Sequence, residues 1–82
     1  MRADEAQTVI RLLRYLVLIE ETSTGFSAFS PDLSGCVAAA MTKSEVERLM
    51  QEAISMHLES MREDGLPIPR NTTSAAYVEV AA

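Results

Sequence analysis

The sequence predicts a small α+β domain of the order βββαβ, in which one long helix packs on one face of a small, mainly antiparallel sheet. Two observations predict it: a long amphipathic helix with clear signals at both ends, and short β-rich segments on both sides of that helix. The chain has 82 residues, which is enough for one domain only. Because so short a chain buries little surface, association with other chains is expected to add to its stability.

The helix is predicted from Lys43 to Asp64, because apolar residues recur there at intervals of three and four positions. Thr42 and Glu45 form the pattern of a capping box at its start, and Gly65 followed by Pro67 is a stop signal. The opposite face is charged and polar, so one side of the helix is expected to lie on a sheet. The apolar side comprises Val46, Leu49, Met50, Ala53, Ile54, His57, Leu58 and Met61.

Four segments rich in β-branched and aromatic residues, or alternating in polarity, are predicted as strands. They are Tyr15 to Glu20, Phe26 to Ser30, Cys36 to Ala40 and Ala76 to Val80. The first two form a hairpin across a polar link, and the last alternates cleanly. Pro31 to Gly35 has the composition of a turn, because Pro fixes φ, Asp can bond its own backbone and Gly tolerates positive φ.

The segment before the first strand fits helical spacing, and we expect a short helix from Asp4 to Arg14, although Arg11 and Arg14 fit an extended lead-in to the first strand equally well. The chain is accordingly divided into an N-terminal extension, residues 1–14, and one domain, residues 15–82. The most hydrophobic stretch, Val9 to Ile19, is shorter than a membrane span and is interrupted by two arginines. No membrane segment and no signal peptide are expected, and the chain is predicted to be cytoplasmic.

Acidic residues outnumber basic ones by 12 to 7, for a formal net charge of -5. Seven scattered positive charges make no stripe that would neutralise phosphates, so direct binding of DNA or RNA by this chain is disfavoured. An acidic protein of this kind instead suits a basic partner.

The single cysteine, Cys36, and the single histidine, His57, form neither a disulfide framework nor a four-ligand zinc site within one chain. A nucleophile and base pair made of these two residues is the basis of a hydrolase hypothesis, but no third, orienting group is evident. Metal-dependent nuclease chemistry needs several converging carboxylates, and the strands offer only Glu20 and Glu79. The sequence therefore predicts no catalytic residues, no metal site and no cofactor, and we expect the protein not to be an enzyme.

Two motifs in a fixed order carry a resemblance. The first is Phe29-x-Pro31-Asp32-Leu33-x-Gly35-Cys36, which follows the first two predicted strands. The second closes the long helix as His57-Leu58-Glu59-x-Met61-Arg62-Glu63-Asp64-Gly65-x-Pro67-Ile68-Pro69. From Tyr15 to Val80 the chain resembles the HicB family of antitoxins.

The resemblance implies a domain similar to a partly degraded ribonuclease H core. It also implies a partner, a small basic toxin of the HicA type that cleaves messenger RNA with a histidine and whose active site the antitoxin covers. Many relatives carry a ribbon-helix-helix or helix-turn-helix domain after the fourth strand. Because the sequence stops at Ala82, we expect a minimal form without such a domain.

Four residues are predicted to bind the partner: Phe29, Asp32 and Leu33 as an exposed apolar anchor on a proline-braced loop, and Glu20 as an acidic, orienting side chain. An equally weighted alternative makes the loop a fold-specific turn only. A homodimer or higher oligomer is also expected, because the segment from Val37 to Met41 is apolar and the sheet has an open edge. The alternative function is an orphan HicB-like structural or ligand-binding module without a cognate toxin.

Overall fold

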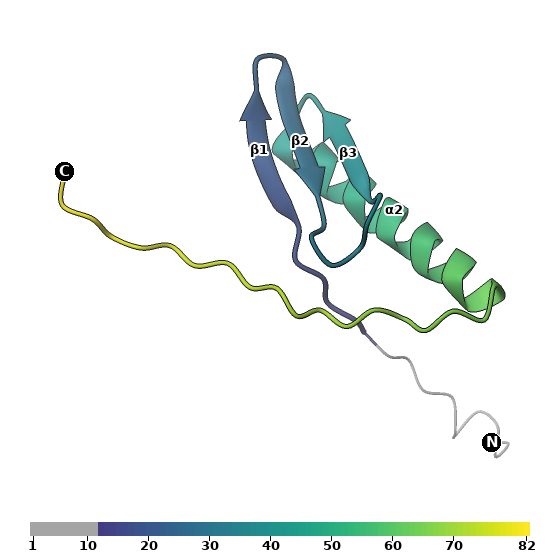
Figure 1. Cartoon of the computed structure of the whole chain (residues 1–82). Coiled ribbons are helices and arrows are strands. Elements are labelled where there is room, and N and C mark those ends of the chain that lie inside the picture. Colours follow the sequence, from purple (N-terminus) through teal and green to yellow (C-terminus); the bar gives the residue numbers. More distant parts are fainter. Residues whose placement is uncertain (1–11) are drawn as a thin grey trace, which may run out of the picture.

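The computed structural model describes residues 12–82. This part contains three strands, β1 (Leu18–Thr22), β2 (Gly25–Phe29) and β3 (Val37–Ala40), followed by one helix, α2 (Lys43–Glu63) (Figure 1). The strands form one antiparallel sheet in the order β1-β2-β3. The predicted α+β arrangement of antiparallel strands followed by a long helix is confirmed. Residues 4–11 of the helix predicted from Asp4 to Arg14 lie outside the described residues, and the described residues 12–14 are not helical. The prediction is wrong for this last part, because the chain there is already extended and the Leu16 N–H donates to the Asn71 side chain instead of closing a helical turn.

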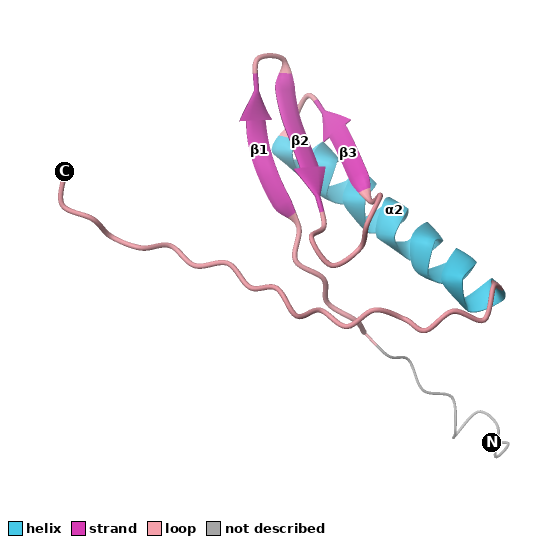
Figure 2. Cartoon of the chain, viewed as in Figure 1, coloured by secondary structure: helices cyan, strands magenta, loops and turns pink. Residues whose placement is uncertain are grey.

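The helix lies across one face of the sheet, where it packs against β2 and β3 (Figure 2). Its buried residues follow the predicted spacing, with Val46 and Met50 fully buried and Leu58 nearly so. On the sheet, Ala28 faces them from the middle of β2. The core therefore lies between the helix, the last two strands and the loop that joins them, which contributes Leu33 and Cys36.

Both helix ends have the predicted signals. At the start, the Thr42 hydroxyl accepts a hydrogen bond from the Glu45 N–H at 3.2 Å. At the end, Gly65 has φ +70°, its N–H bonds the Arg62 carbonyl, and the Leu66 N–H bonds the Met61 carbonyl at 2.9 Å. This pair of bonds is a Schellman motif, which satisfies carbonyls at the end of the helix and turns the chain away from its axis.

The first strand lies further along the chain than predicted, at Leu18–Thr22 instead of Tyr15 to Glu20. The turn that joins it to β2 consists of only two residues, so pairing extends to Thr22 and Gly25. At the other end, Leu16 uses its backbone groups elsewhere: its N–H donates to the Asn71 Oδ1 atom and its carbonyl accepts from the Ser30 hydroxyl. These side-chain bonds replace the ladder that a longer strand would need.

The predicted strand from Ala76 to Val80 is not part of the sheet. Residues 66–82 run as an extended segment without regular secondary structure, which crosses beneath the start of β1 and then leaves the sheet (Figure 1). A strand is defined by hydrogen bonds to a neighbouring strand, and within residues 12–82 this segment has no such neighbour. The alternating sequence pattern fixes the extended conformation but not the partner.

Candidate interaction surface

The loop that joins β2 to β3 is built from two consecutive tight turns. The Leu33 N–H donates to the Ser30 carbonyl, and the Cys36 N–H donates to the Leu33 carbonyl, each at 3.2 Å. Pro31 occupies the second position of the first turn, and Gly35, at φ +88°, the third position of the next. The predicted turn chemistry of this loop is thus present. The loop directs the Leu33 side chain into the core, whereas the Asp32 side chain lies nearer the surface.

Asp32 binds the segment that follows the helix, not the backbone of its own loop. Its Oδ2 atom accepts the N–H groups of Thr72 at 2.9 Å and Thr73 at 3.0 Å, and its Oδ1 atom accepts both hydroxyl groups, at 3.2 and 2.9 Å. We call this arrangement the Asp32 clamp. Hydrogen bonds from Thr73, assisted by those from Thr72, stabilise the carboxylate and lower the pKa of Asp32.

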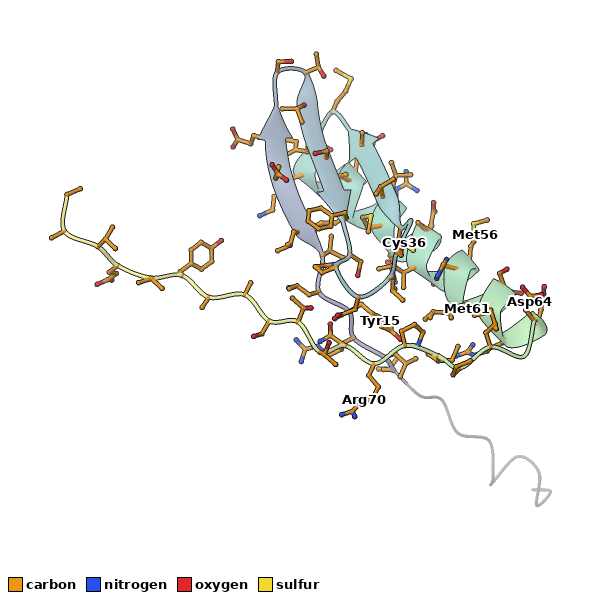
Figure 3. All side chains as sticks on the ribbon, viewed as in Figure 1. Tyr15, Cys36, Met56, Met61, Asp64 and Arg70 are labelled. Carbon is orange, nitrogen blue, oxygen red and sulfur yellow. The ribbon has the colours of Figure 1, made fainter. Side chains whose placement is uncertain are left out.

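Sequence reasoning predicted an irregular crossover after the helix and missed the residues that bind there. These are Thr72 and Thr73, which donate to Asp32, and Tyr15 and Asn71, whose bonds lie nearby. Tyr15, which is labelled in Figure 3, donates its hydroxyl to the Pro69 carbonyl, and the Asn71 side chain accepts the Leu16 N–H. All of these contacts join residues more than 35 positions apart. No local sequence pattern predicts contacts between residues so far apart. The available signal is the run Asn71-Thr72-Thr73 after two prolines, whose side chains can all form hydrogen bonds.

Leu33 and Asp32, two of the four predicted partner-binding residues, are placed in the body of the domain. Leu33 is 1% exposed and belongs to the core, and Asp32 is half-buried at its clamp. Phe29 and Glu20, the other two, are exposed on the strands. The structure therefore divides the predicted set into two residues that shape the loop and two that present surface.

The exposed pair belongs to the sheet face that points away from the helix, which we call the outer sheet face. Cross-strand pairing aligns Leu18 with Phe29 and Phe29 with Val37, so three apolar side chains form a row across the sheet. Phe29 is 39% exposed and Val37 67%. Glu20 lies two positions further along β1 and therefore on the same face. An apolar row with an acidic neighbour is a suitable surface for a basic protein.

Cys36 lacks the setting that a nucleophilic cysteine needs. The Cys36 side chain is 4% exposed in the core between sheet and helix (Figure 3), and this burial raises the pKa of its thiol. A reactive cysteine requires the opposite shift and an accessible sulfur. Among residues 12–82, moreover, no three His, Cys, Asp or Glu side chains gather where they could hold a metal ion.

The described residues also include no helix that is both long and apolar enough to cross a membrane. The described residues form a small α+β domain with an exposed outer sheet face and a loop whose Asp32 is bonded to the segment after the helix. The family model described as HicB-like antitoxin of bacterial toxin-antitoxin system matches residues 15–81. The chain belongs to this family of antitoxins, and the resemblance inferred from its two motifs is confirmed.

Relatives of known sequence include an uncharacterised 14.9 kDa protein of Haemophilus phage HP1, 36% identical over 64 residues. That match covers 78% of this chain but 48% of the phage protein, so the chain spans about half the length of that relative. A UPF0150 protein of Synechocystis is 34% identical, with 73% of this chain and 77% of the relative covered. A UPF0150 protein of Helicobacter pylori is 32% identical, with 78% and 90% covered.

Two solved structures share the fold. One is a HicA3 and HicB3 toxin-antitoxin complex, in which the matching chain superposes with a TM-score of 0.61 at 30% identity, covering 73% of this chain and 70% of that one. The other is the antitoxin HicB3, with a TM-score of 0.62 at 30% identity, covering 73% and 44%. Both superpositions agree with the family assignment of the chain and with its fold.

Proposed function

We propose that this protein is an antitoxin that binds a small basic HicA-type toxin and neutralises it by covering its active site. The observation that carries the proposal is membership of the antitoxin family across residues 15–81. A similar chain occurs in a complex described as one of HicA3 and HicB3. The acidic balance of the chain, with a net charge of -5, supports a basic partner because complementary charge speeds encounter and fixes orientation.

We assign the toxin contact to the outer sheet face. Phe29 is the anchor, because an exposed aromatic side chain buries a large apolar area when a partner covers it. Glu20 is the orienting charge beside it. In this proposal Asp32 and Leu33 contribute indirectly. The loop that begins directly after Phe29 is held in place by the bonds of Asp32 to Thr73 and by the burial of Leu33 in the core.

Coexpression with a small basic HicA-type toxin, taken from the adjacent gene where that gene encodes one, tests the function. We expect the two proteins to copurify and the antitoxin to restore growth that the toxin arrests. If the pair neither copurifies nor restores growth, the antitoxin proposal fails, and the alternative of an orphan HicB-like module is favoured.

The location of the contact is tested by placing an aspartate on either side of the domain. Phe29→Asp changes the outer sheet face, and Met56→Asp changes a methionine that is 70% exposed on the helix. We expect Phe29→Asp to weaken toxin binding by at least about tenfold, the loss typical of an interface anchor, and Met56→Asp to bind as the unaltered protein does. Thermal unfolding of both variants shows whether the fold is kept. Equal toxin affinity for both folded variants would exclude the outer sheet face.

A further inference from the structure

The segment 74–82 has the sequence of a strand without a neighbouring strand. Its pattern alternates, yet Tyr77 is fully exposed and both Val78 and Val80 are 79% exposed. Water competes for the backbone groups of a single extended segment, and exposed valines gain nothing from burial, so such a segment is stable as a strand only against a sheet edge. The sequence of this segment thus favours a strand, but within residues 12–82 no other strand is paired with it.

The path of the chain is fixed up to the residue before this segment. The Asp32 clamp holds Thr72 and Thr73, and the Asn71 side chain binds Leu16 at 3.0 Å. Leu16 lies two residues before β1 begins. The clamp therefore delivers the segment to the end of the sheet where β1 starts, and from there the segment runs away from its own sheet (Figure 1).

A strand that follows α2 has one natural position in this fold. In the described sheet β2 is paired on both sides, whereas β1 and β3 each have one edge without a described strand. A strand that returns after the helix and lies parallel to β1, on its outer side, makes the usual right-handed crossover. The Asp32 clamp places residues 71–73 beside the start of this β1 edge.

The chain contains no strong turn signal that would fold the segment back onto its own β1. Between Thr73 and Ala82 there is no Gly, Pro, Asn or Asp, and of the residue types that dominate tight turns only Ser74, which favours them more weakly, is present. Upstream, Pro67 and Pro69 favour an extended path, because each also restricts the residue before it. The segment therefore continues outward as an extended arm.

We propose that segment 74–82 pairs as a fourth strand with the β1 edge of a second copy of this chain, and that the second copy returns the same contact. Exchange of an identical element costs little, because each sheet receives the strand that its own topology lacks. A two-fold axis makes both contacts equivalent. This inference concerns the protein without toxin and does not depend on the proposed toxin contact.

The first test is the mass of the full chain in solution, measured by sedimentation equilibrium. We expect a dimer of the 9.0 kDa chain and, for the double variant Val78→Pro and Glu79→Pro, a monomer at the same concentration. An edge strand bonds its neighbour through alternate residues, so one of two adjacent prolines must remove a ladder hydrogen bond. Ala82→Pro, at the end of the segment and beyond the alternating residues 76–80, is the control and should remain dimeric. A monomeric unaltered chain, or a dimer that the double variant leaves intact, would overturn the proposal.

The second test identifies the occupant of the edge. In a mixture of isotope-labelled and unlabelled copies, filtered nuclear Overhauser spectra should show contacts from Tyr77 or Val78 of one copy to β1 of the other. Contacts confined to a single copy would mean that the strand folds back, and the exchange would be refuted. It would equally be refuted if the amides of 76–80 became protected from hydrogen exchange only after toxin is added, because the toxin would then be the partner of this segment.

Discussion

The carboxylate of Asp32 holds Thr73, which lies 41 positions later in the sequence, by both its backbone N–H at 3.0 Å and its hydroxyl at 2.9 Å. The bond joins the loop before β3 to the segment after α2. It explains how a segment without regular secondary structure keeps a defined path past the start of β1. Asp32, a residue of the loop motif that resembles the HicB family, thus anchors the C-terminal segment.

Replacement of Asp32 by Asn should weaken this anchor. Asn keeps the size of the side chain, and its oxygen can still accept the two N–H groups while its NH2 group faces the two hydroxyls, but the bonds lose the negative charge that strengthens them. We expect faster hydrogen exchange at the amides of Thr72 and Thr73 and a lower melting temperature. Glu20→Gln, the same chemical change on the exposed outer sheet face, is the control and should alter neither. Unchanged protection at both threonines in Asp32→Asn would show that the clamp does not hold the segment.

Stability should depend on pH through Asp32. Hydrogen bonds from Thr73 lower its pKa below the ordinary value of 3.8, so the folded protein binds this proton less readily than the unfolded chain does. The stabilising contribution is therefore complete above the ordinary value and is lost as pH falls through the lowered one. Urea unfolding between about pH 5 and pH 2 measures this loss. The same series on Asp32→Asn should lack this component; identical pH profiles for the two proteins would contradict the prediction.

Leu33 should matter for stability far more than its position in a loop suggests. It is 1% exposed, and truncation to Ala leaves a cavity, so we expect Leu33→Ala to lower the free energy of unfolding by about 2–5 kcal/mol. Val37→Ala, at a position 67% exposed, should change it by less than about 0.5 kcal/mol. Urea denaturation compares the two. A small effect at Leu33 would mean that the loop does not pack as described.

Gly25 and Gly35 allow a matched comparison, because both have positive φ but only one lacks space for a side chain. A Cβ atom on Gly25 would lie 2.3 Å from the Ala40 carbonyl oxygen, whereas at Gly35 no atom lies within 4 Å. We expect Gly35→Ala to cost about 1–2 kcal/mol of backbone strain. Gly25→Ala should cost more, because β3 must also move. Thermal unfolding measures both, and equal losses would argue against the close approach of Gly25 to β3.

The Cys36 thiol should be unreactive in the folded protein. Burial raises its pKa, so little thiolate forms near neutral pH, and the sulfur is inaccessible. We expect iodoacetamide to modify Cys36 slowly in buffer and rapidly in urea. Cys36→Ser should preserve toxin binding, whereas the hydrolase hypothesis for Cys36 and His57 expects that substitution to abolish an activity. Rapid alkylation of the native protein would reopen that hypothesis.

Local patterns were sufficient for the elements whose causes are local. The helix begins one residue after its Thr42 cap and ends before Gly65, as spacing and capping residues predict. The turns at Pro31 and Gly35 follow from the backbone preferences of those residues. The binding role of the four predicted residues stays a prediction. Sequence reasoning did not separate Leu33, which is buried, from Phe29, which is exposed.

The sequence by itself determined the composition of the domain: antiparallel strands, a capped helix, an acidic surface and the motifs of an antitoxin family. Only the tertiary structure decided that Asp32 binds Thr72 and Thr73, and that β1 starts at Leu18. It also decided that the alternating segment after the clamp leaves the sheet. The physical reason is that helix caps and turns depend on residues a few positions apart, whereas hydrogen bonds across the fold and the pairing of a strand depend on which edge lies beside it.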